Sequence, residues 1–161
     1  MPSAVSAAPN PLAAQLLAAH NLERQSVGLV PIVWDPALAA AADAYAVQLA
    51  RTGAWGHSPP QTRVDQGENL WMGTHGAFSV YAMMAGWTGE KRMFRPGIFP
   101  NVARRGSWHD VGHYTQIIWP ATKRVGCSVR SSARNDYLVC RYSVAGNVIG
   151  QPVGARQLAG R

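Results

Sequence analysis

Residues 112–119 read GHYTQIIW, and a proline at position 120 ends this run. His113 follows a glycine at the point where the apolar segment opens. Periodicity does not decide between a short buried helix and a strand over so few residues, because both patterns fit a brief apolar run. The fold around His113 therefore has to be inferred from the segments on either side of it.

The segment that follows this run has the pattern of a β-hairpin. Two strand-like runs, 125–130 and 137–144, are separated by turn-forming residues at 131–136. The simplest pairing centres the turn between Ala133 and Arg134. We therefore expect these two strands to complete a small antiparallel sheet.

The hairpin places the two cysteines of the chain opposite each other. With the turn centred in this way, Cys127 and Cys140 are direct cross-strand partners, at a Cα distance that a disulfide allows. Such a bond persists only in an oxidising compartment, so the pair favours a secreted protein, extracellular or periplasmic. Two buried free thiols are the alternative.

Two helices are expected upstream. Asn10 and Asp35 each precede a proline, which combines a good N-cap with the residue favoured at the first helical position. The first helix should run to near Gly28, and Gly53 should end the second. Both helices carry apolar residues at helical spacing, so each should cover a core.

A third helix is predicted over residues 78–94, with Met83, Met84 and Trp87 on its apolar stripe. Glu90 continues this stripe, because positions 83, 87 and 90 are spaced by four and three. A carboxylate on that face needs a partner or an accessible cleft. Periodicity alone therefore marks Glu90 as a candidate site residue.

Three further titratable residues occupy constrained positions. Glu68 lies in a GENL run at the entry to a short strand expected over 69–72, and His57 precedes a serine and two prolines in a rigid turn. His113 opens the apolar run described above. Residue types alone do not show whether these side chains converge.

The composition is that of one globular domain. The chain has 161 residues, of which 47% are apolar and 14% charged, so a single core can bury most of its surface. We expect this domain to span 11–150, with a flexible N-terminus at 1–10 and a C-terminal tail at 151–161. The small residues near position 1 resemble the surroundings of a signal-peptide cleavage site, so we expect a removed leader, with a cytoplasmic protein as the alternative.

The charge pattern restricts the partners. The net charge is +7, but no basic run interleaves with aromatic residues, so we do not expect nucleic-acid binding. No apolar stretch reaches 18 residues, so no transmembrane segment is expected. We expect a monomer whose arginines serve mainly as a solubilising face, with an anionic partner as the alternative.

The motifs together resemble the CAP superfamily, which comprises the cysteine-rich secretory, antigen 5 and pathogenesis-related-1 proteins. GHYTQIIW resembles its first signature and residues 137–148 its second. Further matches lie at 20–24, 57–58, 67–70, 87–90 and 125–127, in the family's order, so the resemblance covers about 12–150. Val144 departs from a proline common in the second signature. The single cysteine pair replaces the several bridges of plant and animal members, which suggests a microbial member.

The resemblance implies an α+β fold, a three-layer α-β-α sandwich with a small antiparallel sheet between helices. It also implies that GHYTQIIW forms a short helix. In this family a large cleft gathers two histidines and two glutamates, which correspond here to His57, Glu68, Glu90 and His113.

These residue types suggest a metal site. His57 and His113 are the expected ligands of a divalent cation such as Zn²⁺. Glu68 and Glu90 are the candidate catalytic carboxylates, which would orient the imidazoles or polarise a metal-bound water. A metal-dependent extracellular hydrolase of the peptidase type is one hypothesis, although catalytic zinc sites usually have three protein ligands. A serine hydrolase built on Ser58 is another, but no nucleophile elbow accompanies it.

The favoured class is a secreted binding or interaction protein, because the resemblance points to proteins that bind sterols or other lipids or act between host and pathogen. The expected partner is a small hydrophobic ligand or an extracellular, cell-surface partner. Trp71, Met83 and Trp87, together with Met84, are the candidate lining of an apolar groove, although such a stripe is also typical of a plain core. Whether the domain has a catalytic activity is left open.

Overall fold

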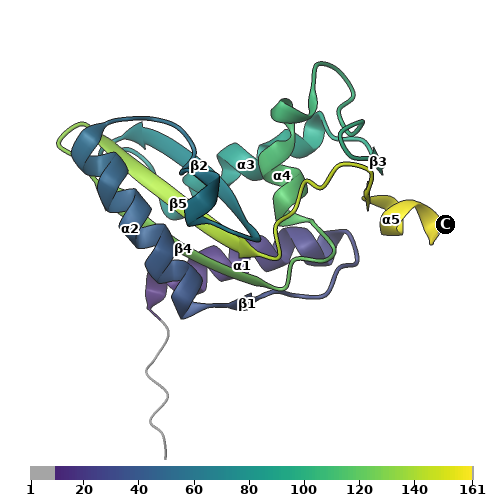
Figure 1. The fold of residues 1–161 in the computed structure, drawn as a ribbon, viewed down its shortest axis with the longest axis horizontal. Coiled ribbons are helices and arrows are strands. Elements are labelled where there is room, and N and C mark those ends of the chain that lie inside the picture. Colours follow the sequence, from purple (N-terminus) through teal and green to yellow (C-terminus); the bar gives the residue numbers. More distant parts are fainter. Residues whose placement is uncertain (1–9, 161) are drawn as a thin grey trace, which may run out of the picture.

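A four-stranded sheet lies between two layers of helices in the computed structural model, which describes residues 10–160 (Figure 1). The order of the strands is β1-β4-β5-β2, in which β1 runs parallel to β4 and the other neighbours are antiparallel. The strands are β1 (Val33–Trp34), β2 (Gln66–Thr74), β4 (Arg124–Ser131) and β5 (Asn135–Ser143). The expectation about residues 1–9 lies outside the described part of the chain.

The helices cover both faces of this sheet. Helix α2 packs on one face against β4 and β5, and α1, α3 and α4 lie together on the other (Figure 1). Their bounds are α1 (Pro11–Ser26), α2 (Pro36–Thr52), α3 (Val80–Thr88) and α4 (Gly112–Ile117). The predicted α-β-α sandwich is thus confirmed. The first six residues of GHYTQIIW form the expected short helix, and the parallel β1 is added to the expected antiparallel sheet.

The first two helices begin and end at the predicted caps. The side chain of Asn10 accepts a hydrogen bond from the backbone N–H of Leu12 (3.0 Å). Asp35 accepts from the N–H groups of Ala37 and Leu38 (2.8 and 3.2 Å). Gly53 ends α2 with φ of 68°, a left-handed conformation that glycine adopts without steric cost.

The third helix is shorter than predicted. It ends at Thr88, and a 3₁₀ turn, Gly89–Arg92, follows it in place of the helix expected up to residue 94. Two glycines near this point lower the helix propensity, which gives the chain a place to tighten. Glu90 therefore lies on this turn, two residues beyond the end of the helix whose periodicity indicated it.

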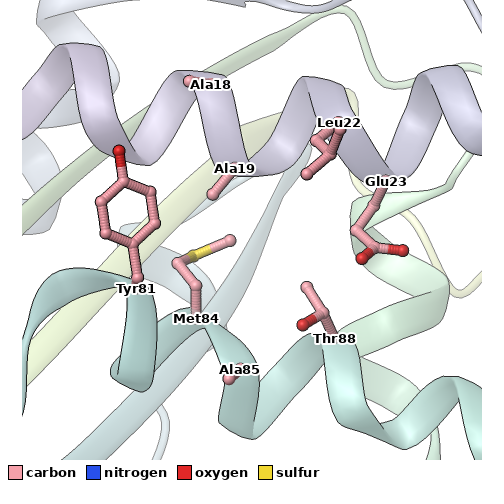
Figure 2. Close-up of a pocket in the computed structure, with 8 residues that line it drawn as sticks. All are labelled: Ala18, Ala19, Leu22, Glu23, Tyr81, Met84, Ala85 and Thr88. Carbon is pink, nitrogen blue, oxygen red and sulfur yellow. The ribbon is translucent and has the colours of Figure 1, made fainter.

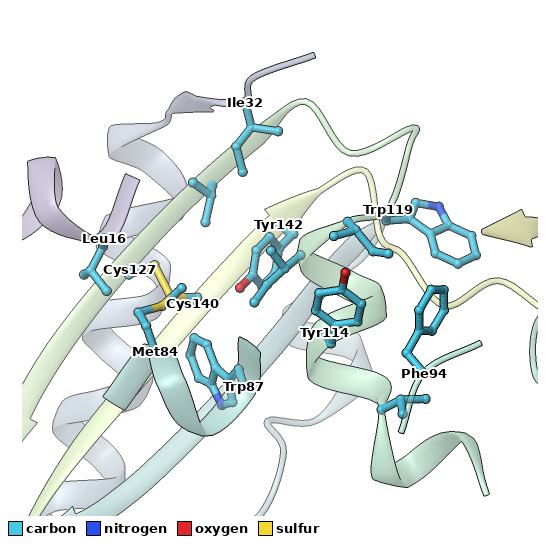
Figure 3. Packing of buried hydrophobic residues seen from close by; sticks show 14 of the residues in the cluster. Leu16, Ile32, Met84, Trp87, Phe94, Tyr114, Trp119, Cys127, Cys140 and Tyr142 are labelled. Carbon is cyan, nitrogen blue, oxygen red and sulfur yellow. A yellow bond between two sulfur atoms is a disulfide. The ribbon is translucent and has the colours of Figure 1, made fainter. Parts of the chain in front are cut away.

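The two faces of β5 separate two apolar clusters. Leu138, Cys140 and Tyr142 face the layer of α1, α3 and α4, where they pack with Trp87 (Figure 3). The alternate residues face α2 with its Leu49. This alternation is the period-two pattern of a strand buried on both sides.

Helix α2 lies unusually close to the sheet at Gly126. A Cβ atom at this position of β4 would collide with the backbone of Asp35 and Ala39 at the start of α2. Only glycine leaves room for that approach. The start of α2 is therefore fixed directly against the strand that carries Cys127.

The predicted hairpin and disulfide are confirmed. Cys127 and Cys140 are register partners on β4 and β5, with a Cα–Cα distance of 4.1 Å and an S–S bond. Ser131 pairs with Asp136, so the turn is centred between residues 133 and 134 as expected. The alternative of two free thiols was wrong.

The expectation of a C-terminal tail from residue 151 was wrong, because these residues pair with and pack against the rest of the fold. Strand β6 (Pro152–Val153) pairs antiparallel with β3 (Gly97–Ile98), and Val153 is fully buried. A short left-handed helical turn, α5 (Ala155–Ala159), follows. Within residues 10–160, no helix combines the length and the apolar character needed to cross a membrane.

Candidate functional site

A cleft of about 270 Å³ contains three of the four predicted site residues. His57, Glu68 and His113 line it directly. Glu90 reaches the same place through its hydrogen bond to the His113 ring. The structure therefore brings together the four side chains that the sequence motifs indicated.

The first imidazole is fixed by a buried carboxylate. His57 lies in the loop after α2, and Glu68 lies near the start of β2. Nδ1 of His57 donates a hydrogen bond to Oε1 of Glu68 (2.8 Å). The His57 side chain is 54% exposed and that of Glu68 is fully buried, so the ring faces the cleft from a rigid support.

The Glu68 carboxylate has no free hydrogen-bonding capacity. It also accepts from the backbone N–H and the hydroxyl of Ser58 (2.9 and 2.7 Å) and from Nε of Arg141 (2.8 Å). Burial by itself would raise the pKa of Glu68, but the hydrogen bonds from His57 and Ser58 and the charge of Arg141 outweigh it and lower that pKa to about 2. Glu68 is therefore a permanent anion near neutral pH.

Ser58 binds the Glu68 carboxylate and Arg141, and its contacts are not those of a nucleophile. Its hydroxyl donates to Glu68 and accepts from Nη2 of Arg141 (3.0 Å). Across the described residues it makes no hydrogen bond to an imidazole, which an activated serine needs. The geometry does not support the serine-hydrolase hypothesis.

The second imidazole is held in the same way. Nδ1 of His113, in α4, donates to Oε1 of Glu90 (2.6 Å), and the backbone N–H of Tyr114 donates to Oε2 (2.9 Å). The His113 ring also stacks on Trp87, with ring centroids 5.8 Å apart and planes inclined by 13°. These contacts fix both the position and the tautomer of His113.

A hydrogen-bonded chain connects this site to α1. The Asn69 side-chain amide donates to the backbone carbonyl of His113 (3.1 Å) and to the hydroxyl of Tyr142 (3.1 Å). The Tyr142 hydroxyl lies 2.8 Å from Nε2 of His20, whose Nδ1 donates to the carbonyl of Leu16 (2.7 Å). Burial lowers the pKa of His20 to about 4, so its ring is neutral near pH 7. His20 is thus a structural residue.

The donor set suits a cation such as Zn²⁺. In both rings Nδ1 donates a hydrogen bond to a carboxylate. This leaves the lone pair of Nε2 of His57 and of His113 available on the walls of one cleft. Within residues 10–160, the one set of three His, Cys, Asp or Glu ligand atoms that lie within 4.8 Å of one another is His20, Cys127 and Cys140, and its sulfurs form the disulfide. The cleft therefore offers two protein ligands to a metal.

Sequence reasoning missed other residues of the cleft. Trp108 and His109, on a 3₁₀ turn, line it with Asn147, and their two rings stack at 3.9 Å. Asn147 is fixed by hydrogen bonds to Thr115 and to Gly112 in α4. The signal that marks the turn is a capping box, in which Ser107 and Asp110 exchange hydrogen bonds.

The apolar groove lies elsewhere than predicted. Met83 and Trp87 are only 3% and 2% exposed and belong to the core, and Trp71 packs edge-on against Phe78. A groove of about 410 Å³ lies instead between α1 and α3 (Figure 2). Of the four candidates, only Met84 is in its lining. The apolar stripe of α3 therefore has two roles: Met83 and Trp87 pack in the core, and Met84 lines the groove.

Comparison with known proteins agrees with this geometry. The family described as "Cysteine-rich secretory protein family" (CAP) matches residues 17–142. "Pathogenesis-related protein 1C" of Nicotiana tabacum is 37% identical over 136 residues, covering 84% of this chain and 76% of the relative. "Peptidase inhibitor R3HDML" of Homo sapiens is 33% identical over 158 residues, covering 84% and 60%.

A solved structure described as "Crystal structure of NaASP2 with Zn2+" superposes with a TM-score of 0.74 at 25% identity, covering 89% of this chain and 85% of that one. The family match spans most of the chain, including His57, Glu68, Glu90 and His113 and both cysteines of the disulfide. The chain therefore belongs to the CAP family of cysteine-rich secretory proteins.

Proposed function

We propose that this protein is a secreted CAP-domain binding protein that holds a divalent cation, such as Zn²⁺, between His57 and His113. The proposal depends on one observation: Nδ1 of each ring donates to a glutamate, so Nε2 of each ring is available to a metal in the same cleft. The zinc-containing NaASP2 structure supports the choice of metal. The disulfide and the secretory relatives support export.

The two carboxylates favour binding over hydrolysis. Glu68 accepts four hydrogen bonds, and each oxygen of Glu90 accepts one. These contacts suit carboxylates that orient imidazoles and do not suit a general base. A bound cation would supply Lewis acidity and an attachment point for an anionic or carbonyl ligand. No observation favours the metal-dependent hydrolase over this binding role.

Zinc titration tests the proposal. Losing only the hydrogen-bond partners of metal ligands weakens metal binding by about 10- to 100-fold. The His57→Ala, His113→Ala double variant should therefore bind Zn²⁺ more than about 100-fold more weakly than wild type, in calorimetric titrations of the metal-free protein. His75→Ala is the matched control, because His75 also pairs with a carboxylate, Asp136, but lies outside the cleft. Equal affinity in wild type and the double variant would place the ion elsewhere.

The second candidate function is the binding of a small apolar ligand, such as a lipid, in the groove between α1 and α3. The groove is lined mainly by apolar side chains, and Leu22 and Tyr81 on its sides are 67% and 56% exposed (Figure 2). Large exposed apolar side chains around a cavity are typical of a ligand site.

Filling the groove tests this function. Ala85→Trp should remove binding of the uncharged fluorophore Nile red, because the indole would occupy the space beside Met84. Ala82→Trp makes the same change on the same helix outside the lining and should leave binding intact. Nile red binding that survives Ala85→Trp would show that the groove is not the site.

A further inference from the structure

Strand β2 forms one edge of the four-stranded sheet, and the two-residue strand β1 forms the opposite edge (Figure 1). The last part of β2 is open to solvent, because Met72 is 41% exposed and Thr74 is exposed as well. An edge strand presents unpaired N–H and C=O groups to whatever lies beside it. The pairing of β2 with β5 shows which of these groups are vacant.

The register fixes which residues of β2 turn their backbone groups outward. At the turn of the hairpin, the N–H of Ser132 donates to the carbonyl of Asn135 (2.8 Å), so odd-numbered residues of β5 bond to β4 and even-numbered ones bond to β2. The even-numbered residues of β5 pair with odd-numbered residues of β2. The backbone groups of Leu70, Met72 and Thr74 therefore point away from the sheet.

Two of these three residues already have a partner at the edge. The carbonyl of Leu70 accepts a hydrogen bond from Nε1 of Trp87 (3.1 Å), and that of Thr74 accepts from the N–H of Ala77 (3.1 Å). Met72 lies between them, and neither its N–H nor its C=O makes a hydrogen bond in the part of the chain that the structure describes. The edge thus has one residue with both a vacant donor and a vacant acceptor.

A vacant donor and a vacant acceptor on one residue match a second copy of the same edge. When two identical strands pair antiparallel around a twofold axis, the residue on the axis faces its own copy, and the two residues exchange both hydrogen bonds. The N–H of Met72 would then donate to the C=O of Met72 of the partner subunit, and the reverse. A longer strand of another protein would also need the carbonyls of Leu70 and Thr74, which already accept one hydrogen bond each.

Exposed aromatic side chains flank Met72 on both faces of the sheet. On the face of α2, the exposed Trp55 packs against Tyr137, the register partner of Met72, with ring centroids 6.4 Å apart. On the other face, the exposed Phe78 packs edge-on against Trp71 (5.2 Å). Exposed apolar side chains that gather in one place are typical of a protein–protein contact.

The sequence around this edge carries no charge. Residues 69–89 include no Lys, Arg, Asp or Glu and no proline, although the net charge of the chain is +7. Two copies with the same net charge repel each other least where neither presents a charged side chain. Sheet edges are commonly protected from pairing by lysine or proline, and this edge has neither. The charge pattern therefore favours this edge over the rest of the surface as the contact between two copies.

We propose that two copies of this chain form a dimer through the edges of β2, paired antiparallel around a twofold axis at Met72. The two sheets then continue into each other, and Trp55 and Phe78 of each copy cover the two faces of the junction. This dimer replaces the monomer expected from the sequence. It depends neither on the metal cleft nor on the α1–α3 groove.

Analytical ultracentrifugation of the full chain over a range of concentrations, with a metal chelator present, tests the dimer. Wild type should show a reversible equilibrium between monomer and dimer. Met72→Lys should raise the dissociation constant at least about tenfold, because two like charges would lie opposite each other at the axis. Val33→Lys is the matched control: Val33 is 59% exposed on β1, at the opposite edge, so this variant should dimerise like wild type.

Met72→Pro tests the backbone hydrogen bonds directly. The N–H that proline lacks points away from β5, so the pairing within the sheet keeps all its bonds, and an edge strand tolerates proline at such a position. Both hydrogen bonds across the axis would lose their donor. The dissociation constant should therefore rise at least about tenfold in a variant whose circular dichroism spectrum shows that it is folded.

Three outcomes would overturn the proposal. Wild type that sediments as a monomer at every concentration would rule out the dimer. A dimer that Val33→Lys weakens as much as Met72→Lys would place the contact elsewhere on the surface. A folded Met72→Pro variant that dimerises like wild type would show that the edges do not pair through Met72; if that variant does not fold, the comparison of Met72→Lys with Val33→Lys decides.

Discussion

Replacing Arg141 with methionine is expected to lower the free energy of unfolding at pH 7 by about 3–5 kcal/mol. Arg141 and Glu68 are direct cross-strand partners on β5 and β2, and their side chains are 3% and 0% exposed. The Glu68 anion would remain buried after the substitution without its cation. The guanidinium also donates to the Ser58 hydroxyl. Glu68, which accepts from His57, and Ser58, which donates to Glu68, would therefore both lose a hydrogen-bond partner.

Denaturant unfolding of matched variants measures this effect. Arg130 forms an ion pair with Asp43 at a similar distance, 2.7 Å against 2.8 Å for Arg141 and Glu68, but its two side chains are 52% and 36% exposed. Exposed pairs contribute less than about 1 kcal/mol, so Arg130→Met should be nearly neutral. Equal losses in the two variants would mean that burial does not set the strength of the Arg141–Glu68 pair.

The pH dependence of stability provides a second measurement of the same pair. The pKa of Glu68 is about 2 in the folded protein, against an ordinary value of 4.5, so its stabilising contribution is complete above pH 4.5 and is lost as the pH falls toward 2. Without Arg141 the pKa of Glu68 should be less depressed. The Arg141→Met variant should therefore lose less stability over this acid range than wild type does.

Local rules were sufficient for the parts of the fold that neighbouring residues determine. Asn10 and Asp35 start helices because their side chains bond to N–H groups two or three residues ahead. The disulfide was predictable because Cys127 and Cys140 share one hairpin, whose turn fixes the register. Glu90 was indicated by helical spacing, although the helix ends two residues before it.

Contacts between distant segments were beyond such rules. The register of β2 on β5 pairs Glu68 with Arg141, 73 residues apart, and no local pattern specifies that pairing. For the same reason, periodicity placed Met83 and Trp87 on the correct stripe of α3 without showing that the stripe is core there. Convergence at the cleft was likewise indicated by family motifs and not by spacing.

Arg24 illustrates how such distant contacts hold the site in place. Its side chain, 1% exposed, donates to the carbonyls of Val30, Ile117, Trp119 and Thr122 at 2.8–3.2 Å. Burial lowers its pKa to about 10, so it still carries a charge at pH 7. Two of these carbonyls lie at or just beyond the end of α4, where a cation also complements the helix dipole. Arg24 therefore clamps α4, and α4 carries His113.

Replacing Arg24 with methionine should lower the free energy of unfolding by about 3–5 kcal/mol, because several buried carbonyls lose their donors at once. Arg51→Met, at the exposed end of α2, should change stability by less than about 0.5 kcal/mol. Under conditions where the Arg24 variant is folded, its Zn²⁺ affinity should fall by about tenfold, since α4 no longer holds His113 rigidly. A destabilised variant that binds Zn²⁺ like wild type would show that Glu90 and Trp87 fix His113 without help from α1.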